Sequence, residues 1–183
     1  MAKEETTQAI HLDNIKIGHF DSSIRRNSFS CGRVNIDNFL KKSAPNQHKK
    51  CHSRVYYALL GDQLIGYYCL AAASRPPLEM SEEAAEFFAR INNVPCLYLG
   101  MIAVQKEFQG NGIGKKLMVH AMETTARVSD LVGIYALILQ AADQEVAGRY
   151  AKWGFAYFTG EESKNQPNMF IALATIKKAL QSA

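Results

Sequence analysis

The sequence has no hydrophobic run of the roughly 20 residues needed to cross a bilayer. Its first residues, MAKEETTQ, are polar and lack the apolar core of a secretory signal. The four cysteines form no C-x-x-C pair, and Cys69 and Cys96 lie within apolar runs, as reduced buried thiols do. No cluster of side chains has the spacing of a metal site. We therefore expect a cytoplasmic protein with no membrane partner and no metal.

The chain has 183 residues, of which 48% are apolar, so it can bury one core and we expect a single domain over residues 1–183. Hydrophobic periodicity predicts alternating strands and helices, and so an α/β or layered α+β fold with about seven strands. The expected strands are 10–20, 54–60, 63–73, 96–104, 133–139, 155–158 and 169–176, with 96–104 buried on both faces. The expected helices are 35–42, 82–91, 113–128 and 144–153.

Local signals mark several of these boundaries. Gly61 and Asp62 separate two β-rich runs, which indicates a two-residue hairpin. Ser81 and Asp143 precede helical patterns and are expected N-caps, while Gly154 follows one as a C-terminal glycine does.

Positive charge is concentrated in one segment, residues 24–54, here called the basic segment. It holds eight basic residues and one acid, Asp37, although the net charge of the chain is only +4. Such a run most often forms a solvated surface; the alternative is a binding site for a polyanion or a phosphorylated ligand. The eight residues are Arg25, Arg26, Arg33, Lys41, Lys42, Lys49, Lys50 and Arg54.

The stretch FQGNGIGKK, residues 108–116, places three glycines between a predicted strand and a predicted helix. A turn of this kind presents unpaired backbone N–H groups at a helix N-terminus, where the helix dipole also favours an anion. Glycine allows positive φ and a close approach of ligand to backbone. A Walker loop would end in G-K-[ST], and a dinucleotide loop would read G-x-G-x-x-G, so neither pattern fits.

The pattern Gln109-x-x-Gly112-x-Gly114 resembles the pyrophosphate loop of the GNAT acyltransferases, and GRYAKWGF, residues 148–155, is similar to the signature of that family's last helix. The stretch from Phe29 to Ala73 resembles the toxin branch of the family. The resemblance covers about residues 10–174 and implies the GNAT fold, whose sheet is mixed and mostly antiparallel. This chain departs from the pattern at Gly100, where those toxins often have arginine, and at Asp143, where many GNAT enzymes have asparagine.

The resemblance implies acetyl-CoA as cofactor. The strand backbone would pair with pantetheine, the loop N–H groups would hold the pyrophosphate, and Lys115 or Lys116 would add charge. The implied cofactor-binding residues are Met101, Ile102, Ala103, Val104, Gln109, Gly110, Asn111, Gly112, Ile113, Gly114, Lys115 and Asp143. Tyr150 matches the general acid that reprotonates the leaving thiolate; with a pKa of about 10, a free tyrosine is protonated at neutral pH. From the residues alone, Tyr150 would simply pack against Trp153 or Phe155.

The toxin branch acetylates the α-amine of aminoacyl-tRNA and is paired with ribbon-helix-helix antitoxins. The resemblance also allows a homodimer. The resemblance thus makes the basic segment the expected tRNA-binding surface. No acid in a central strand presents itself as a base, which favours an α-amine, with a pKa of about 7.7–8.0, over a lysine side chain. Two alternatives are a GNAT enzyme for a small-molecule or protein amine and a non-catalytic acyl-CoA sensor.

Overall fold

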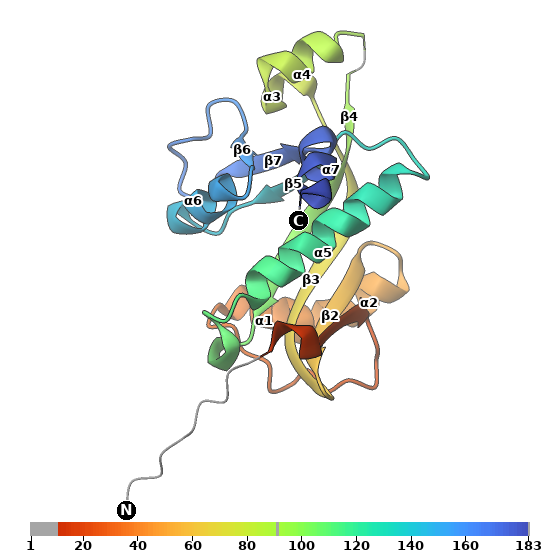
Figure 1. Cartoon of the computed structure of the whole chain (residues 1–183), viewed down its shortest axis with the longest axis vertical. Coiled ribbons are helices and arrows are strands. Elements are labelled where there is room, and N and C mark those ends of the chain that lie inside the picture. Colours follow the sequence, from red (N-terminus) through yellow and green to blue (C-terminus); the bar gives the residue numbers. More distant parts are fainter. Residues whose placement is uncertain (1–10, 91, 183) are drawn as a thin grey trace, which may run out of the picture.

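A computed structural model describes residues 11–90 and 92–182. These residues form one seven-stranded sheet in the order β1-β2-β3-β4-β5-β7-β6 (Figure 1). The strands are β1 (Ile15–His19), β2 (Arg54–Leu60), β3 (Gln63–Arg75), β4 (Val94–Val104), β5 (Ala136–Gln140), β6 (Ala156–Tyr157) and β7 (Asn168–Ala172). The β4–β5 pair is parallel and the other strand pairs are antiparallel. The predicted mixed, mostly antiparallel sheet is confirmed.

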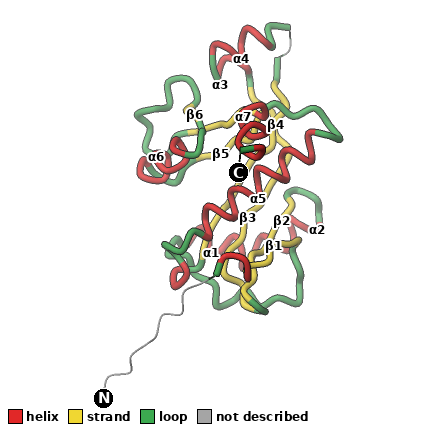
Figure 2. The backbone as a smooth tube through the Cα atoms, viewed as in Figure 1, coloured by secondary structure: helices red, strands yellow, loops and turns green. Residues whose placement is uncertain are grey.

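Helices cover both faces of this sheet (Figure 2). They are α1 (Val34–Asn38), α2 (Ala44–Lys49), α3 (Pro77–Met80), α4 (Glu82–Phe87), α5 (Ile113–Ser129), α6 (Gln144–Lys152) and α7 (Leu173–Gln181). A π-helical turn, Phe39–Ser43, joins α1 to α2, and 3₁₀ turns span Leu12–Asn14 and Lys106–Phe108.

Alternation along the strands divides the core into layers. Leu97 and Leu137 pack with α5 and α7 on one face, while their chain neighbours Cys96 and Ala136 pack with α3 and α4 on the other. At the opposite end of the sheet, Tyr67 packs with the helical segment 34–49. The long helix α5 therefore lies across the sheet with its N-terminus beside the end of β4 (Figure 1).

The predicted turn and cap residues are confirmed. Gly61 has φ +58° in the β2–β3 hairpin, and Gly154 has φ +92° just after α6. The Ser81 hydroxyl accepts a hydrogen bond of 3.0 Å from Ala84 N–H, and the Asp143 carboxylate accepts one of 2.8 Å from Val146 N–H.

Several predicted elements are wrong in extent. Residues 173–176, expected to continue a strand, begin helix α7, because β7 ends at Ala172 and Ile176 is needed on the helix that packs against α5. The first strand begins at Ile15 after a 3₁₀ turn, and the helix expected over 82–91 ends at Phe87. Residues 10 and 91 lie outside the described part of the chain.

The sheet splits between β4 and β5. The two strands pair only from Cys96↔Ala136 to Leu99↔Leu139, although β4 continues to Val104. Gly100 is the extra residue of a bulge, since Leu99 pairs with Leu70 and Met101 pairs with Cys69. Strand 96–104 is thus not buried on both faces throughout, because beyond Leu99 it has no β5 neighbour and its residues are mostly half-buried.

Candidate active site

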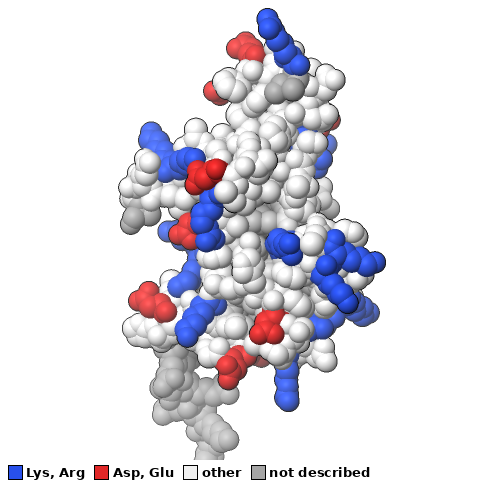
Figure 3. Space-filling view, turned by 90° about the vertical axis from the view of Figure 1, so that its right-hand side faces the viewer, with Lys and Arg blue, Asp and Glu red and all other residues white. Residues whose placement is uncertain are grey.

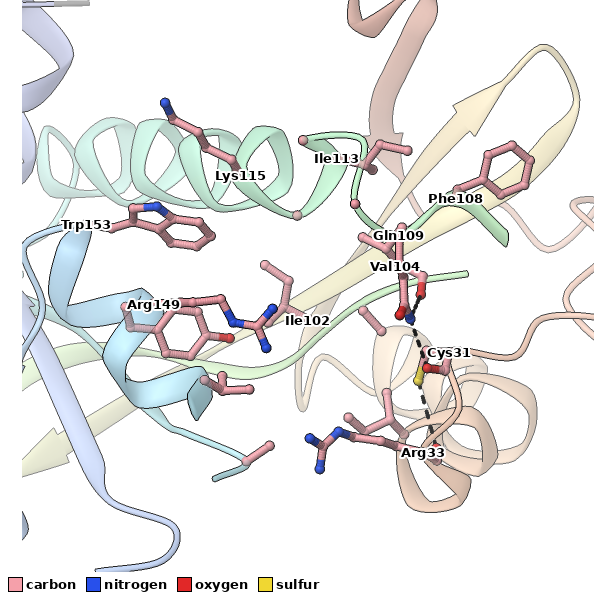
Figure 4. Close-up of a pocket in the computed structure, with 18 residues that line it drawn as sticks. Cys31, Arg33, Ile102, Val104, Phe108, Gln109, Ile113, Lys115, Arg149 and Trp153 are labelled. Carbon is pink, nitrogen blue, oxygen red and sulfur yellow. Dashed lines mark hydrogen bonds between the residues drawn. The ribbon is translucent and has the colours of Figure 1, made fainter. Parts of the chain in front are cut away.

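A cleft of about 440 Å³ opens where β4 and β5 separate. Its walls come from the end of β4, the glycine loop, α6 and the segment before α1 (Figure 4). The predicted cofactor-binding residues that line it are Ile102, Ala103, Val104, Gln109, Gly110, Gly112, Ile113, Gly114 and Lys115, and the predicted acid, Tyr150, lines it too.

The glycine loop has the geometry of an anion site. Gly110 and Gly112 have φ +82° and +77°, which L side chains rarely adopt. Within the described residues, no hydrogen-bond acceptor is found for the backbone N–H groups from Gly110 to Lys115. Free N–H groups at the start of a 17-residue helix form a site that attracts phosphate.

The side-chain amides of two loop residues donate to backbone carbonyls and so hold the loop in shape. Gln109 Nε2 donates to the carbonyl oxygens of Cys31 at 2.9 Å and Val104 at 3.0 Å. Asn111 Nδ2 donates to the carbonyls of Phe108 at 3.2 Å and Gln109 at 3.1 Å. These bonds fix the loop against both β4 and the segment before α1.

Three of the predicted cofactor-binding residues do not line the cleft. Met101 points to the opposite face of β4, where it packs with the helical segment 34–49, and Asn111 is turned back onto its own loop. The Asp143 carboxylate caps α6 through Val146 N–H and forms an ion pair of 2.5 Å with Arg33. The hydrogen bonds from Val146 and Arg33 hold the pKa of this carboxyl below its usual range.

The two lysines after the loop point to different places. Lys116 Nζ donates to the carbonyl oxygen of Leu12 at 2.5 Å, so its charge serves to hold the N-terminal 3₁₀ turn. Lys115 lines the cleft, and its amine points away from Arg149 (Figure 4).

Tyr150 projects from α6 into the cleft. Its ring lies 5.7 Å from those of Trp153 and Phe155, and no hydrogen bond to its hydroxyl is formed by the described residues. Burial raises the pKa of Tyr150 to about 12, with the nearby guanidinium groups of Arg149 and Arg33 acting in the opposite sense. The ring packing and the cleft position occur together, so the two interpretations of Tyr150 do not exclude each other.

Arg149 and Trp153, which sequence reasoning missed, also line the cleft. Arg149 lies on α6 and Trp153 is the C-cap residue of that helix, so the helical spacing of 149, 150 and 153 is the signal that could have found them. Figure 4 shows the Arg149 guanidinium directed toward Ile102 and into the cleft.

The segment before α1 forms the opposite wall with Cys31, Arg33 and Ile36. Buried Asp37 shapes it by accepting hydrogen bonds from Ser30 Oγ at 2.9 Å and Cys31 N–H at 2.8 Å. Burial raises the pKa of the Cys31 thiol to about 11, so it stays protonated at neutral pH. Only Arg33 of the eight predicted tRNA-binding residues lines the cleft.

The other seven basic residues of the basic segment do not line the cleft. Arg25, Lys42, Lys49, Lys50 and Arg54 are exposed. Two members are half-buried: Lys41 in the π-helical turn, and Arg26, whose guanidinium lies 5.8 Å from the Phe20 ring. One face of the molecule carries a group of Lys and Arg side chains in its lower half (Figure 3).

Acidic side chains are missing from the cleft lining, as far as the chain is described. The same residues contain no group of three or more potential metal ligands, and no helix among them is long and apolar enough to span a membrane.

The chain matches the acetyltransferase (GNAT) family over residues 24–155. It is 27% identical over 165 residues to the probable toxin TacT of Sinorhizobium fredii, covering 85% of this chain and 88% of that protein. It is 28% identical over 131 residues to a tRNA-acetylating toxin of Mycobacterium tuberculosis, covering 70% of this chain and 76% of that protein.

Solved structures of related toxins share the fold. A tyrosine-to-phenylalanine mutant of KacT superposes with a TM-score of 0.83 at 27% identity, over 90% of this chain and 98% of that one. AtaTR bound with acetyl-CoA gives a TM-score of 0.79 at 25% identity, over 92% and 99%. A mutant AtaT toxin bound to the C-terminus of the antitoxin AtaR gives 0.76 at 25% identity, over 91% and 98%.

The family match covers most of the chain and includes the split between β4 and β5, the glycine loop and Tyr150. This chain belongs to the GNAT family of acetyltransferases.

Proposed function

We propose that this protein transfers an acetyl group from acetyl-CoA to the α-amino group of an aminoacyl-tRNA, and so acts as the toxin of a toxin–antitoxin pair. The observation that carries the proposal is one cleft in which free loop N–H groups and the Tyr150 hydroxyl face the same space, in a chain related to a tRNA-acetylating toxin. Acetylation removes the nucleophilic lone pair that the amine needs for peptide-bond formation, so it blocks translation.

The residues present fit acetyl-CoA. Gly110 to Gly114 offer backbone N–H groups for its pyrophosphate, and Ile102 to Val104 leave a strand edge without β5 for its amide-containing arm. Acetyl-CoA supplies the acetyl group as a reactive thioester. An AtaTR structure with acetyl-CoA supports this choice of donor.

Tyr150 is the proposed general acid. Since burial raises its pKa to about 12, the hydroxyl keeps its proton at neutral pH and can donate it from Oη to the departing thiolate. The hydroxyl makes no hydrogen bond within the described residues that would have to break first.

The acceptor amine needs little help to lose its proton. An α-amine has a pKa of about 7.7–8.0, so a useful fraction is neutral at physiological pH, whereas a lysine side chain at about 10.4 needs a base. The cleft lining offers no carboxylate for that purpose. This favours an aminoacyl ester over a protein lysine.

The exposed members of the basic segment are the proposed tRNA contacts, because Lys and Arg side chains bind the phosphate backbone without reading sequence. An antitoxin is the proposed protein partner, as AtaR is for AtaT. We place the reaction in the cytoplasm, where charged tRNA is used.

A radiolabel assay tests the proposal against a small-amine acetyltransferase. Purified protein is incubated with labelled acetyl-CoA and either total charged tRNA or a mixture of polyamines and aminoglycosides. We expect acid-precipitable label on charged tRNA only, and its release on mild alkaline hydrolysis of the aminoacyl ester. Label on the small amines but not on tRNA would favour the alternative enzyme, and label on neither would favour a non-catalytic sensor.

A further inference from the structure

Arg33 and Asp143 join the two walls of the cleft. Arg33 Nη2 lies 2.5 Å from Asp143 Oδ2, although the residues are 110 positions apart, in the segment before α1 and at the N-cap of α6. Their side chains are 46% and 34% exposed. An ion pair this accessible to water contributes little net stability, so it can be exchanged for another partner.

The backbone around Arg33 is anchored by hydrogen bonds, whereas its guanidinium is held by the ion pair with Asp143 alone, within the described residues. Arg33 O accepts a hydrogen bond of 3.0 Å from Asp37 N–H, and Asp37 in turn holds Ser30 and Cys31. The side chain extends into the cleft from this anchored point, toward the wall that carries Arg149 (Figure 4). Its only hydrogen bond within the described residues is the one to Asp143.

Asp143 is not left without partners when Arg33 moves away. Its other oxygen keeps the hydrogen bond from Val146 N–H that caps α6, and the charge of Arg149 also acts on it. Release of Arg33 therefore leaves α6 capped and leaves Tyr150, on the same helix, where it is.

We infer that Arg33 exchanges Asp143 for the phosphate nearest the 3′ end of the bound aminoacyl-tRNA, which makes Arg33 a specificity-determining residue that selects an RNA-linked amine. The inference rests on the proposed function. Arg33 is the one member of the basic segment that reaches the cleft, so an RNA backbone lying along that segment ends beside it. Arg33 meets Asp143 through a single N–H group, whereas a guanidinium can bind a phosphate through two parallel N–H groups.

The phosphates of acetyl-CoA are the other possible source of the anion. The free N–H groups of the glycine loop already offer them a site at the N-terminus of α5. Arg33 lies on the other wall, continuous in sequence with the rest of the basic segment. The tRNA phosphate is therefore the better match, and acetyl-CoA affinity is the measurement that separates the two.

Four proteins test the exchange: wild type, Arg33→Gln, Asp143→Asn and the double variant. Asparagine caps a helix as well as aspartate does, so Asp143→Asn removes the charge and keeps α6. Steady-state kinetics with charged tRNA would be run over a salt series, and acetyl-CoA affinity would be measured by calorimetry. Wild-type activity on charged tRNA is established first, and its absence refutes the proposed function itself.

We expect Arg33→Gln to raise KM for charged tRNA about tenfold, as loss of a hydrogen bond to a charged group does. The slope of log KM against log salt should fall by about 0.7, the value for one single-strand phosphate contact. Asp143→Asn should lower KM about threefold by freeing Arg33, and should have no effect in the Arg33→Gln background. Acetyl-CoA affinity should be equal in all four.

Three results would overturn the inference while leaving the proposed function intact. One is an Asp143→Asn variant with unchanged or higher KM. Another is weaker acetyl-CoA binding by Arg33→Gln at constant KM for tRNA, which would assign Arg33 to the cofactor. The third is a lower melting temperature in both single variants with unaltered KM and salt slope, which would make the pair a structural link between the walls.

Discussion

Leu12, which does not line the cleft, lies beside Gly112 of the glycine loop. A Cβ built on Gly112 would lie 3.4 Å from Leu12 Cδ1, and Lys116 holds the same turn through the Leu12 carbonyl. Glycine at residue 112 therefore allows the positive φ and leaves room for the Leu12 side chain. The proposed phosphate-binding side of the loop is formed by backbone N–H groups.

Gly112→Val should weaken acetyl-CoA binding by tenfold or more. A β-branched residue at φ +77° is strained by about 1–2 kcal/mol or more, and relief of that strain moves the N–H groups that bind pyrophosphate. Isothermal calorimetry would measure the affinity. Gly160→Val is the matched control, since Gly160 also has positive φ, +71°, but lies outside the cleft; it should lose stability and keep its acetyl-CoA affinity. Unchanged affinity in Gly112→Val would refute the loop assignment.

Reversal of Lys49 and Lys50 to glutamate should weaken tRNA binding and flatten its salt dependence by about 0.7–0.9 per lost phosphate contact. Both side chains are exposed at the end of α2 and form no ion pair within the described residues. The double reversal Lys177→Glu/Lys178→Glu on α7 makes the same change in net charge outside the basic segment and should have a much smaller effect. If the two double variants lost equal tRNA affinity, the loss would reflect net charge in general and not a binding site in the basic segment.

The pH profile of acetyl transfer should rise and then stay level. The acceptor amine must be neutral, so the single-turnover rate should increase up to about pH 8. Tyr150 would lose its proton only near its raised pKa of about 12, so the hydroxyl stays protonated well above pH 8. No descending limb is expected below about pH 9.5, beyond which aminoacyl esters hydrolyse too fast to measure. A decline that begins near pH 8.5 would point to a different acid.

Tyr150→Phe should lower kcat by about 10²–10⁴-fold with acetyl-CoA affinity nearly unchanged, because the lost proton matters in thiolate departure and not in binding. The ring contacts with Trp153 and Phe155 remain, so the melting temperature should be preserved. Tyr157→Phe, outside the cleft lining, is the matched control and should retain wild-type kcat. Wild-type turnover in Tyr150→Phe together with a lower melting temperature would make Tyr150 a packing residue.

Features determined by neighbouring residues could be predicted from the sequence. The hairpin at Gly61, the caps at Ser81 and Asp143 and the glycine loop each depend on a few adjacent side chains and dihedral angles. Helix α7 could not be predicted, since the apolar run that it shares with β7 has no turn residue between strand and helix.

Features that depend on distant segments were out of reach. The split after Leu99 arises because β4 continues beyond the last residue of β5 that pairs with it. The hydrophobic periodicity of β4 does not show how long β5 is. The pairing of Arg33 with Asp143 brings together residues 110 positions apart, each of which has a sufficient local explanation as a surface charge or a cap. The sequence therefore indicated the glycine loop and Tyr150, the proposed acid, but not how the opposite wall closes the cleft.

Mass spectrometry of the amino acids released from tRNA is the most direct test of the central claim. Total charged tRNA would be incubated with isotopically labelled acetyl-CoA and wild-type protein, Tyr150→Phe or no protein, and then deacylated. The account predicts Nα-acetylated amino acid, carrying the label, with wild-type protein and a strongly reduced amount with Tyr150→Phe. Label that stays on the RNA after deacylation, on a lysine side chain or on the protein would contradict it.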